Sequence, residues 1–224
     1  MILYRYLNEA FSLQAIQKGE LKVGRLADLN DPADCLPTLS NTPEQGDDAA
    51  KEAFEKRYFS QVYNDVGILS FSATVIDPVI WSHYADAHRG MALGYDFGAR
   101  GAKLFEVVYD DLRAVLDYQE VEKCRIENPE KGQFIESIVT QGFTKKAQSW
   151  NYEKEYRIFV NLYHCQMNGQ HYFVSGMRPK KVVLGVKCRI TESDVLRMVR
   201  HHPPVITRAK MGREKHALVV EGES

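Results

Sequence analysis

The order of the predicted helices and strands is the sequence feature that most restricts how this chain can fold. Helices are concentrated early, whereas strands interrupted by one helix make up the last third. With their capping residues, the helices are predicted at 8–19, 50–61, 77–85, 133–149 and 192–199. Strands are predicted at 2–6, 20–24, 67–73, 90–97, 104–109, 155–161, 171–175, 181–186 and 204–209. A doubly wound parallel sheet needs regular alternation of strand and helix. We therefore expect an α+β fold with mixed or antiparallel sheets.

Capping residues define the start or end of two of these helices. Asn8 is a favourable N-cap residue, and Gly19 is a typical stop signal. Asp77 followed by Pro78 combines an N-cap with proline at the first helical position. The segment 36–48, which is rich in Pro, Asn, Asp and Gly, is expected to be a mobile loop.

The composition indicates one globular domain over residues 1–224. Hydrophobic residues make up 44 % and charged residues 26 % of the chain, a balance that allows a sizeable core. No shift in composition marks a linker. The chain has no run of about 18 apolar residues that could span a membrane, and its first residues do not resemble a signal peptide. We therefore expect a cytoplasmic protein without a membrane partner.

The charge of the chain is balanced overall but unevenly distributed. A net charge of −1 gives no global field that would attract a polyanion. From Arg178 onward, however, the chain has 11 Lys and Arg against 5 Asp and Glu. This basic C-terminal quarter indicates either a solvated surface or a nucleic-acid partner.

One tract, residues 150–157 (WNYEKEYR), concentrates charged residues at the predicted start of a strand; we call it the carboxylate tract. If Glu155 opens the strand, Arg157 shares its face, and Glu153 lies in the turn just before. A carboxylate held at a strand edge can accept a hydrogen bond from a sugar hydroxyl and stabilise a nearby positive charge. The alternative is an exposed, salt-bridged strand end that contributes little to stability.

A second group of candidate residues lies on a predicted strand and on the helix that follows it. With Phe71 directed inward, Ser70 and Ser72 project from the opposite face of the strand. The helix places Trp81 and Tyr84 along one side. Strand and helix could offer an aromatic platform beside two hydroxyl groups. Alternatively, the two aromatic residues belong to the core.

Arg5 lies between Tyr4 and Tyr6 on the first predicted strand. Its planar guanidinium group suits a phosphate or a carboxylate, so a pyrophosphate contact is one interpretation. An edge-strand arginine stacked on a tyrosine is the other.

A metal site is not predicted. The four cysteines are far apart and form no C-x-x-C pair, so we expect reduced thiols rather than zinc ligands. His83 and His88 are five residues apart, which does not place both on one helical face. The chain also lacks the G-x-S-x-G, P-loop and G-x-G-x-x-G motifs.

Taken in order, these tracts resemble a widespread bacterial family of unknown function. Its motifs are Y-[KR]-Y, G-x-[LI]-x-[FV], N-D-P, S-F-S, W-S-H-Y-A, G-x-x-L-G-[FY]-D and W-x-[YF]-E-x-E-[YF]-R. The matching residues are 4–6, 19–23, 30–32, 70–72, 81–85, 90–96 and 150–157. The resemblance covers most of the chain.

The motif order in turn resembles that of ADP-ribosyltransferases, which implies an ADP-ribosyltransferase-like fold with NAD as the substrate. By this resemblance Arg5, with Tyr4 beside it, would contact the NAD phosphates or ribose. Ser70 and Ser72 would lie on the serine-bearing strand of the NAD site.

The same resemblance gives roles to the remaining candidates. Trp81 and Tyr84 compete for the place against nicotinamide. Glu155 would be the catalytic glutamate, with Glu153 as its partner two residues before. The reaction would cleave the nicotinamide–ribose bond through an oxocarbenium-like state, which one carboxylate stabilises.

Three functional hypotheses follow. The first is NAD-dependent ADP-ribosyl transfer or NAD glycohydrolysis in a toxin or phage-defence setting, with a protein, a nucleic acid or water as the acceptor. The second is a catalytically silent module of the same fold that binds a nucleotide or a protein. The third is a hydrolase that uses His83 with Asp77 or Asp86.

Overall fold

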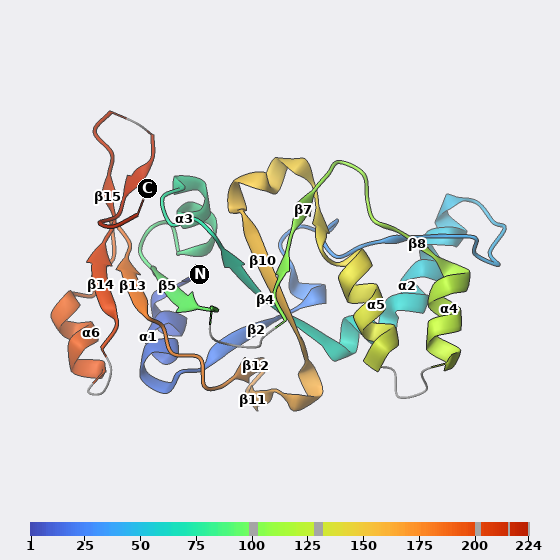
Figure 1. The fold of residues 1–224 in the computed structure, drawn as a ribbon, viewed down its shortest axis with the longest axis horizontal. Coiled ribbons are helices and arrows are strands. Elements are labelled where there is room, and N and C mark those ends of the chain that lie inside the picture. Colours follow the sequence, from blue (N-terminus) through green and yellow to red (C-terminus); the bar gives the residue numbers. More distant parts are fainter. Residues whose placement is uncertain (99–102, 128–131, 200–202, 215, 224) are drawn as a thin grey trace.

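The computed structural model describes residues 1–98, 103–127, 132–199, 203–214 and 216–223. Its helices are α1 (Glu9–Lys18), α2 (Asp48–Asp65), α3 (Pro78–Tyr84), α4 (Tyr118–Glu127), α5 (Gly132–Gly142) and α6 (Glu192–Met198), with the 3-10 helices η1 (Leu26–Asp28), η2 (Gln148–Glu153) and η3 (Leu162–His164). Its strands are β1 (Ile2–Leu7), β2 (Leu21–Arg25), β3 (Thr38–Ser40), β4 (Val66–Ser72), β5 (Met91–Asp96), β6 (Phe105–Glu106), β7 (Val108–Tyr109), β8 (Val115–Asp117), β9 (Lys145–Lys146), β10 (Glu155–Asn161), β11 (Gln166–Asn168), β12 (His171–Val174), β13 (Lys181–Leu184), β14 (Val205–Arg208), β15 (Lys210–Met211) and β16 (Leu218–Val219). The expected α+β fold with a mixed sheet is confirmed (Figure 1).

The main sheet has the strand order β11-β12-β2-β4-β1-β5-β13-β14, and β10 joins it by pairing with β4 and β6. Strand β4 is central because one of its edges pairs with β10 along its whole length. On its other edge, β4 pairs with β2 at Gly67 and Ile68 and with β1 at Ser72. The neighbour on this edge therefore changes from β2 to β1 near Ser70.

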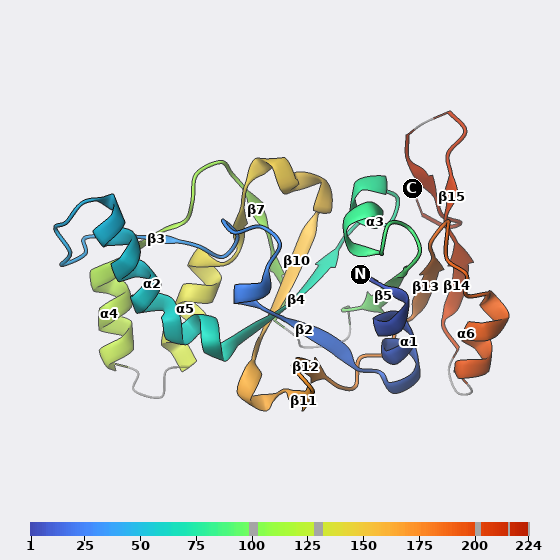
Figure 2. The same cartoon turned by 180° about the vertical axis from the view of Figure 1, so that it is seen from behind.

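The helices lie at the ends and on the faces of this sheet. Figures 1 and 2 show α2, α4 and α5 together at one end of the molecule and α6 at the other. On β1, Leu3 and Leu7 pack into one hydrophobic cluster, whereas Tyr4 and Tyr6 pack into another with Trp81 of α3. This alternation is that of a strand covered on both faces, so β1 separates two parts of the core.

Capping explains why the first helices begin where they do. The side chain of Asn8 accepts a hydrogen bond from the backbone N of Phe11, and Gly19 ends α1 in the left-handed conformation with φ 68°. Asp77 accepts from the backbone N of Val79 and Ile80 at the start of α3. The predicted limits of both helices are thereby confirmed to within one residue.

Two predicted elements are interrupted in the structure, because parts of them pair with other strands. The strand expected at 104–109 divides into β6, which pairs with β10, and β7, which pairs with β9. The helix expected at 133–149 ends at Gly142, and the chain continues into β9 and η2. Glycine is a common residue at a helix end.

Other elements are not among those predicted. Helix α4 is one, although Asp117 accepts hydrogen bonds from the backbone N of Gln119 and Glu120 as an N-cap residue would. The segment 36–48, expected to be a mobile loop, contains β3, which pairs in parallel with β8. Strands β11, β15 and β16 are also too short to leave a periodic pattern in the sequence.

Candidate functional site

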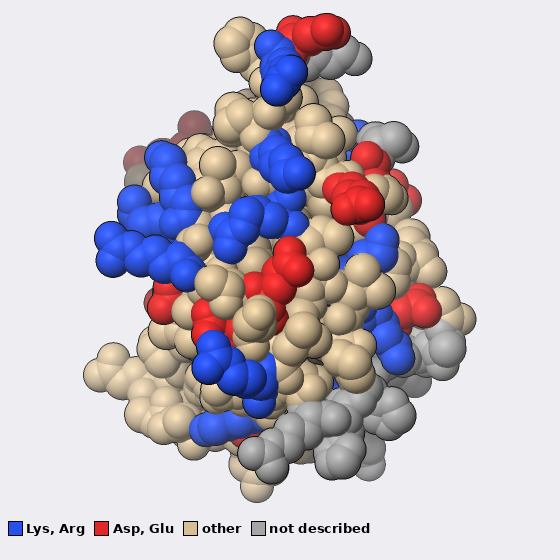
Figure 3. Space-filling view, turned by 90° about the vertical axis from the view of Figure 1, so that its left-hand side faces the viewer, with Lys and Arg blue, Asp and Glu red and all other residues tan. Residues whose placement is uncertain are grey.

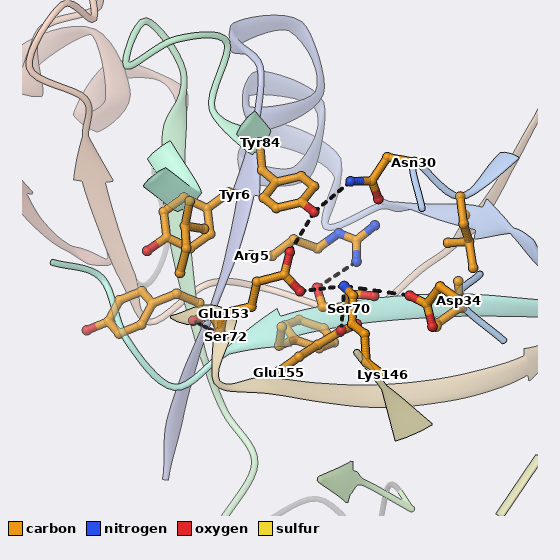
Figure 4. Close-up of a pocket in the computed structure, with 16 residues that line it drawn as sticks. Arg5, Tyr6, Asn30, Asp34, Ser70, Ser72, Tyr84, Lys146, Glu153 and Glu155 are labelled. Carbon is orange, nitrogen blue, oxygen red and sulfur yellow. Dashed lines mark hydrogen bonds and ion pairs between the residues drawn. The ribbon is translucent and has the colours of Figure 1, made fainter. Parts of the chain in front are cut away.

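A cavity of about 200 Å³ lies where β1 and β2 separate beside β4 (Figure 4). Sites that enclose a whole small-molecule ligand usually have volumes of roughly 300–1,000 Å³. This cavity therefore suits one end of a larger ligand. All of the residues predicted for the site except Trp81 line it: Tyr4, Arg5, Ser70, Ser72, Tyr84, Glu153 and Glu155.

The register of the strands brings these residues together. Ser72 of β4 is paired with Tyr4 of β1 on one side and with Glu155 of β10 on the other. The Ser72 hydroxyl also donates a hydrogen bond of 2.6 Å to the backbone carbonyl of Glu153. The end of η2 is thus fixed to β4, and residues from three distant parts of the sequence lie at one level of the sheet.

The two glutamates and the arginine of the carboxylate tract are buried, so the alternative of an exposed, salt-bridged strand end is wrong. Glu153 and Glu155 are each 5 % exposed, and Arg157 is fully buried. The start of β10 is not a sheet edge, because it lies between β4 and β6. Lys154, with φ 45°, occupies the left-handed region and turns the chain between η2 and β10.

Glu155 is held by two cations. Its Oε1 accepts a hydrogen bond of 2.9 Å from Nε of Arg157, and its Oε2 accepts one of 2.8 Å from Nη2 of the same residue. The Nζ of Lys146 lies 3.2 Å from the same Oε2. The prediction that Glu155 opens the strand and shares a face with Arg157 is confirmed.

Glu153 belongs to the same cluster, where it shares Lys146 with Glu155 and has Tyr84 as its second partner (Figure 4). The Tyr84 hydroxyl donates a hydrogen bond of 2.6 Å to its Oε1, and Nζ of Lys146 donates one of 2.5 Å to its Oε2. The side-chain amide of Asn30 donates to the Tyr84 hydroxyl at 3.0 Å. A hydrogen-bonded chain therefore runs from Asn30 through Tyr84 to the two carboxyl groups.

The environments of the two carboxyl groups push their pKa values in opposite directions. Burial raises the pKa of Glu153, even though Lys146 opposes this effect. Burial would also raise the pKa of Glu155, but Arg157 and Lys146 outweigh it and lower that pKa to about 2. A pair of titratable groups with divergent pKa values is typical of acid–base chemistry.

Three further residues complete the site. Lys146 lies on β9, and Asp34, which follows η1, binds Arg157 through both carboxylate oxygens at 2.9 and 2.7 Å. Asn30 belongs to the N-D-P motif, so its sequence context marks it as unusual. Asp34 and Lys146 could not be identified in this way, because the residues near them in the sequence do not indicate that either forms a buried ion pair.

Arg5 lines the cavity and connects two neighbouring strands. Its Nη1 donates a hydrogen bond of 2.9 Å to the backbone carbonyl of Ser70, and its Nη2 donates one of 2.9 Å to that of Lys22. These carbonyls lie on β4 and β2, so Arg5 joins strands that have no backbone pairing there. Its buried Nε has no hydrogen-bond partner among the residues that the structure describes.

The two aromatic candidates of α3 lie in different places. Tyr84 lines the cavity. Trp81 is fully buried in the core, where its Nε1 donates a hydrogen bond of 2.8 Å to the backbone carbonyl of Val75 and its ring contacts Tyr6 edge-on. Of the two, Tyr84 is the residue placed to contact a ligand.

The groups proposed for a hydrolase are engaged elsewhere. Asp77 caps α3, and Asp86 forms an ion pair with Arg89. The ring of His83 lies 6.2 Å from that of Trp150. No interaction in the described part of the chain joins His83 to either aspartate, so the structure gives this hypothesis no support.

Replacing Tyr84 by Phe tests the link between the aromatic wall and the carboxyl pair. The hydroxyl of Tyr84 stabilises the ionised form of Glu153, so its loss is expected to raise the pKa of Glu153. It is also expected to lower the free energy of unfolding by about 1–3 kcal/mol. Carboxyl ¹³C NMR titration and urea unfolding measure the two effects. Tyr163→Phe, at a 90 % exposed tyrosine, is the matched control; equal behaviour of both variants would contradict the expectation.

Neither a cluster of metal-ligating side chains nor a membrane-spanning helix is present among the described residues. Within them, no three His, Cys, Asp or Glu side chains are placed to hold one metal ion. None of the described helices has the length and apolar character needed to cross a membrane.

The comparisons with known proteins connect part of the chain to a family. Residues 80–158 match the family described as "Protein of unknown function (DUF2971)". This segment runs from α3 to β10 and includes Tyr84, Lys146, Glu153 and Glu155. No curated protein and no solved structure matches the chain.

Proposed function

We propose that the cavity binds the nicotinamide–ribose end of NAD and cleaves the bond between them, in ADP-ribosyl transfer or in NAD glycohydrolysis. The observation that carries this proposal is the pair of neighbouring carboxyl groups with divergent pKa values at the cavity. Glycosidic bond cleavage uses such a pair, because one carboxylate must stay charged while the other exchanges a proton.

The reaction gives each glutamate a role. When the bond between C1′ of the ribose and the ring nitrogen breaks, its electron pair goes to the nicotinamide, which leaves uncharged. Glu155, which stays ionised, stabilises the positive charge that develops on the ribose. The acceptor then forms a bond to C1′ and gives up a proton. Glu153 is the better base for it, because its pKa is raised.

The cavity walls are compatible with this ligand. Tyr4 and Tyr84 present rings on which a planar heterocycle can stack, and burial keeps both hydroxyls neutral by raising their pKa. The Nε of Arg5 has a donor available for a carbonyl or phosphate oxygen. The order of Arg5, Ser72, Tyr84 and Glu155 along the chain supports an ADP-ribosyltransferase-like site.

Incubation of the purified protein with NAD tests the proposal. We expect free nicotinamide to appear, at a rate that increases when a suitable acceptor is present. Calorimetry is expected to show binding of NAD. Absence of nicotinamide release with water, protein and nucleic-acid acceptors, together with absence of NAD binding, would contradict the proposal.

The acceptor is a separate variable of this experiment. Figure 3 views the end of the molecule that carries α6 and β14, where Lys and Arg side chains are prominent. Exposed basic residues of the C-terminal quarter include Arg178, Lys180, Lys187 and Arg189. Nucleic acid therefore belongs among the acceptors to be supplied, beside proteins and water. Loss of viability on expression in bacteria would support a toxin or phage-defence setting.

One observation favours a second candidate, a catalytically silent module that binds a nucleotide or a protein. Both carboxylate oxygens of Glu155 are already engaged by Arg157 and Lys146. If these ion pairs persist when the ligand is bound, Glu155 has a structural role. Calorimetric binding of NAD or another nucleotide without any nicotinamide release would favour this candidate.

A further inference from the structure

Lys146 is the cation that joins the two carboxyl groups of the site (Figure 4). Its Nζ lies 2.5 Å from Oε2 of Glu153 and 3.2 Å from Oε2 of Glu155, and Oδ2 of Asp34 lies 3.6 Å away. The ammonium group also lies 4.8 Å from the centre of the Trp150 ring. Lys146 is 6 % exposed, so water does not screen these contacts.

We propose that Lys146 is a positioning residue of this site: its ammonium group holds Glu153 and Glu155 side by side, so that Glu155 stays charged while Glu153 exchanges a proton. This inference rests on the proposed cleavage of NAD for its catalytic consequence. The arrangement of charges that it describes does not depend on any substrate.

The geometry explains why the site needs this cation. Two carboxylates so close together repel each other, and without a cation between them one would take up a proton. The guanidinium group of Arg157 contacts Glu155 and Asp34, whereas Glu153 has Lys146 as its cationic contact among the described residues. Lys146 is thus the group that connects Glu153 to the rest of the cluster.

The remaining ionisable groups do not replace Lys146. The ionisable groups around the cluster that come from η2 and β10 are Tyr152, Glu153, Glu155 and Arg157. Those that other elements contribute are Arg5, Asp34, Cys35, Tyr84 and Tyr109. The tyrosines stay neutral because burial raises their pKa, that of Tyr109 to about 12. Three cations, Lys146, Arg5 and Arg157, balance the three carboxylates of the cluster. These carboxylates are Asp34, Glu153 and Glu155, and removal of Lys146 leaves them with two cations.

Lys146→Met removes the charge and is expected to lower kcat/KM for NAD cleavage by about 100-fold or more at neutral pH. It is also expected to move the acid limb of the pH–rate profile to higher pH, because Glu153 loses its cationic contact and Glu155 loses one of its two cations. Lys146→Arg keeps the charge and is expected to retain most of the activity and the position of the acid limb. Should the Met variant fail to fold, Lys146→Gln removes the charge but keeps a hydrogen-bond donor.

The matched control is the neighbouring lysine. Lys145 forms an ion pair with Asp110 at 2.6 Å, and its side chain is 27 % exposed. Lys145→Met is therefore expected to leave the pH–rate profile as in the original protein. A loss confined to stability would lower activity equally at all pH values and would not move the acid limb.

Carboxyl ¹³C NMR titration provides a readout that is independent of NAD. Signals of Glu153 and Glu155 are assigned by their loss in the Glu153→Gln and Glu155→Gln variants. We expect Lys146→Met to raise the pKa of Glu153 and of Glu155, because it removes a cation from both, and Lys145→Met to leave the two pKa values unchanged. Unchanged titration of both glutamates in Lys146→Met would overturn the inference. A raised pKa in a protein that releases no nicotinamide would support the positioning role and contradict NAD cleavage.

Discussion

We expect Glu155→Gln to lower the rate of nicotinamide release from NAD by about 100-fold or more. The substitution keeps the shape of the side chain but removes its negative charge. In the folded protein Glu155 is ionised because Arg157 and Lys146 overcome the effect of its burial. A neutral amide at this position cannot offset the positive charge that develops on the ribose. In bound NAD the positive charge lies on the nicotinamide ring, and it moves to the ribose only in the transition state. The substitution should therefore lower kcat more than it lowers the affinity for NAD.

Steady-state kinetics with NAD and calorimetry measure these two quantities. Glu106→Gln is the matched control, since Glu106 is an exposed glutamate on β6, opposite Tyr156 of β10. It is expected to leave nicotinamide release unchanged. A Glu155→Gln protein that is folded, binds NAD and releases nicotinamide at the original rate would rule out a catalytic role for Glu155.

Arg157→Met is expected to lower the free energy of unfolding by about 3–5 kcal/mol. The guanidinium group is fully buried and donates to Glu155, Asp34 and the backbone carbonyl of Phe143. Its removal leaves buried carboxylates without their principal cation, and burial of an unpaired charge is costly. Urea unfolding followed by circular dichroism measures the change.

The control for this variant is a surface ion pair. Arg89, which pairs with Asp86, is exposed, so Arg89→Met is expected to leave the free energy of unfolding nearly unchanged. Similar losses in both variants would contradict the special role of the buried cluster.

Acid should affect the original protein and the Arg157→Met variant differently. The pKa of Glu155 in the folded protein, about 2, lies below its ordinary value of 4.5. Its ionisation therefore stabilises the fold above pH 4.5, and this contribution is lost as the pH falls towards 2. With Arg157 absent the pKa of Glu155 rises, so the stability of the variant should decline less steeply over this interval.

Much of the local structure around the site could be predicted from the sequence. The start of β10 at Glu155 and the shared face of Glu155 and Arg157 follow from strand alternation. The starts of α1 and α3 follow from Asn8 and Asp77. Such features depend on residues that are close together in the chain, so the sequence alone is enough to predict them.

Elements that depend on distant partners were beyond prediction. Helix α5 ends at Gly142, and Lys146 lies beyond it on β9, which pairs with β7. The periodic pattern of the residues after 142 does not indicate the pairing of β9 with β7. The choice between Trp81 and Tyr84 was likewise open, because both lie on one side of α3. Only the packing of Trp81 against Tyr6 places it in the core.

The sequence by itself determined that a strand begins at Glu155, within the carboxylate tract, and that Glu155 and Arg157 lie on the same face of this strand. Only the tertiary structure decided that Glu153, Glu155 and Arg157 are buried, that Lys146 connects the two glutamates, and that Asp34 binds Arg157 from 123 positions away in the chain. The physical reason is that alternation and capping are set by neighbouring residues. The charge state of a buried carboxyl group is instead set by every group that packing brings around it.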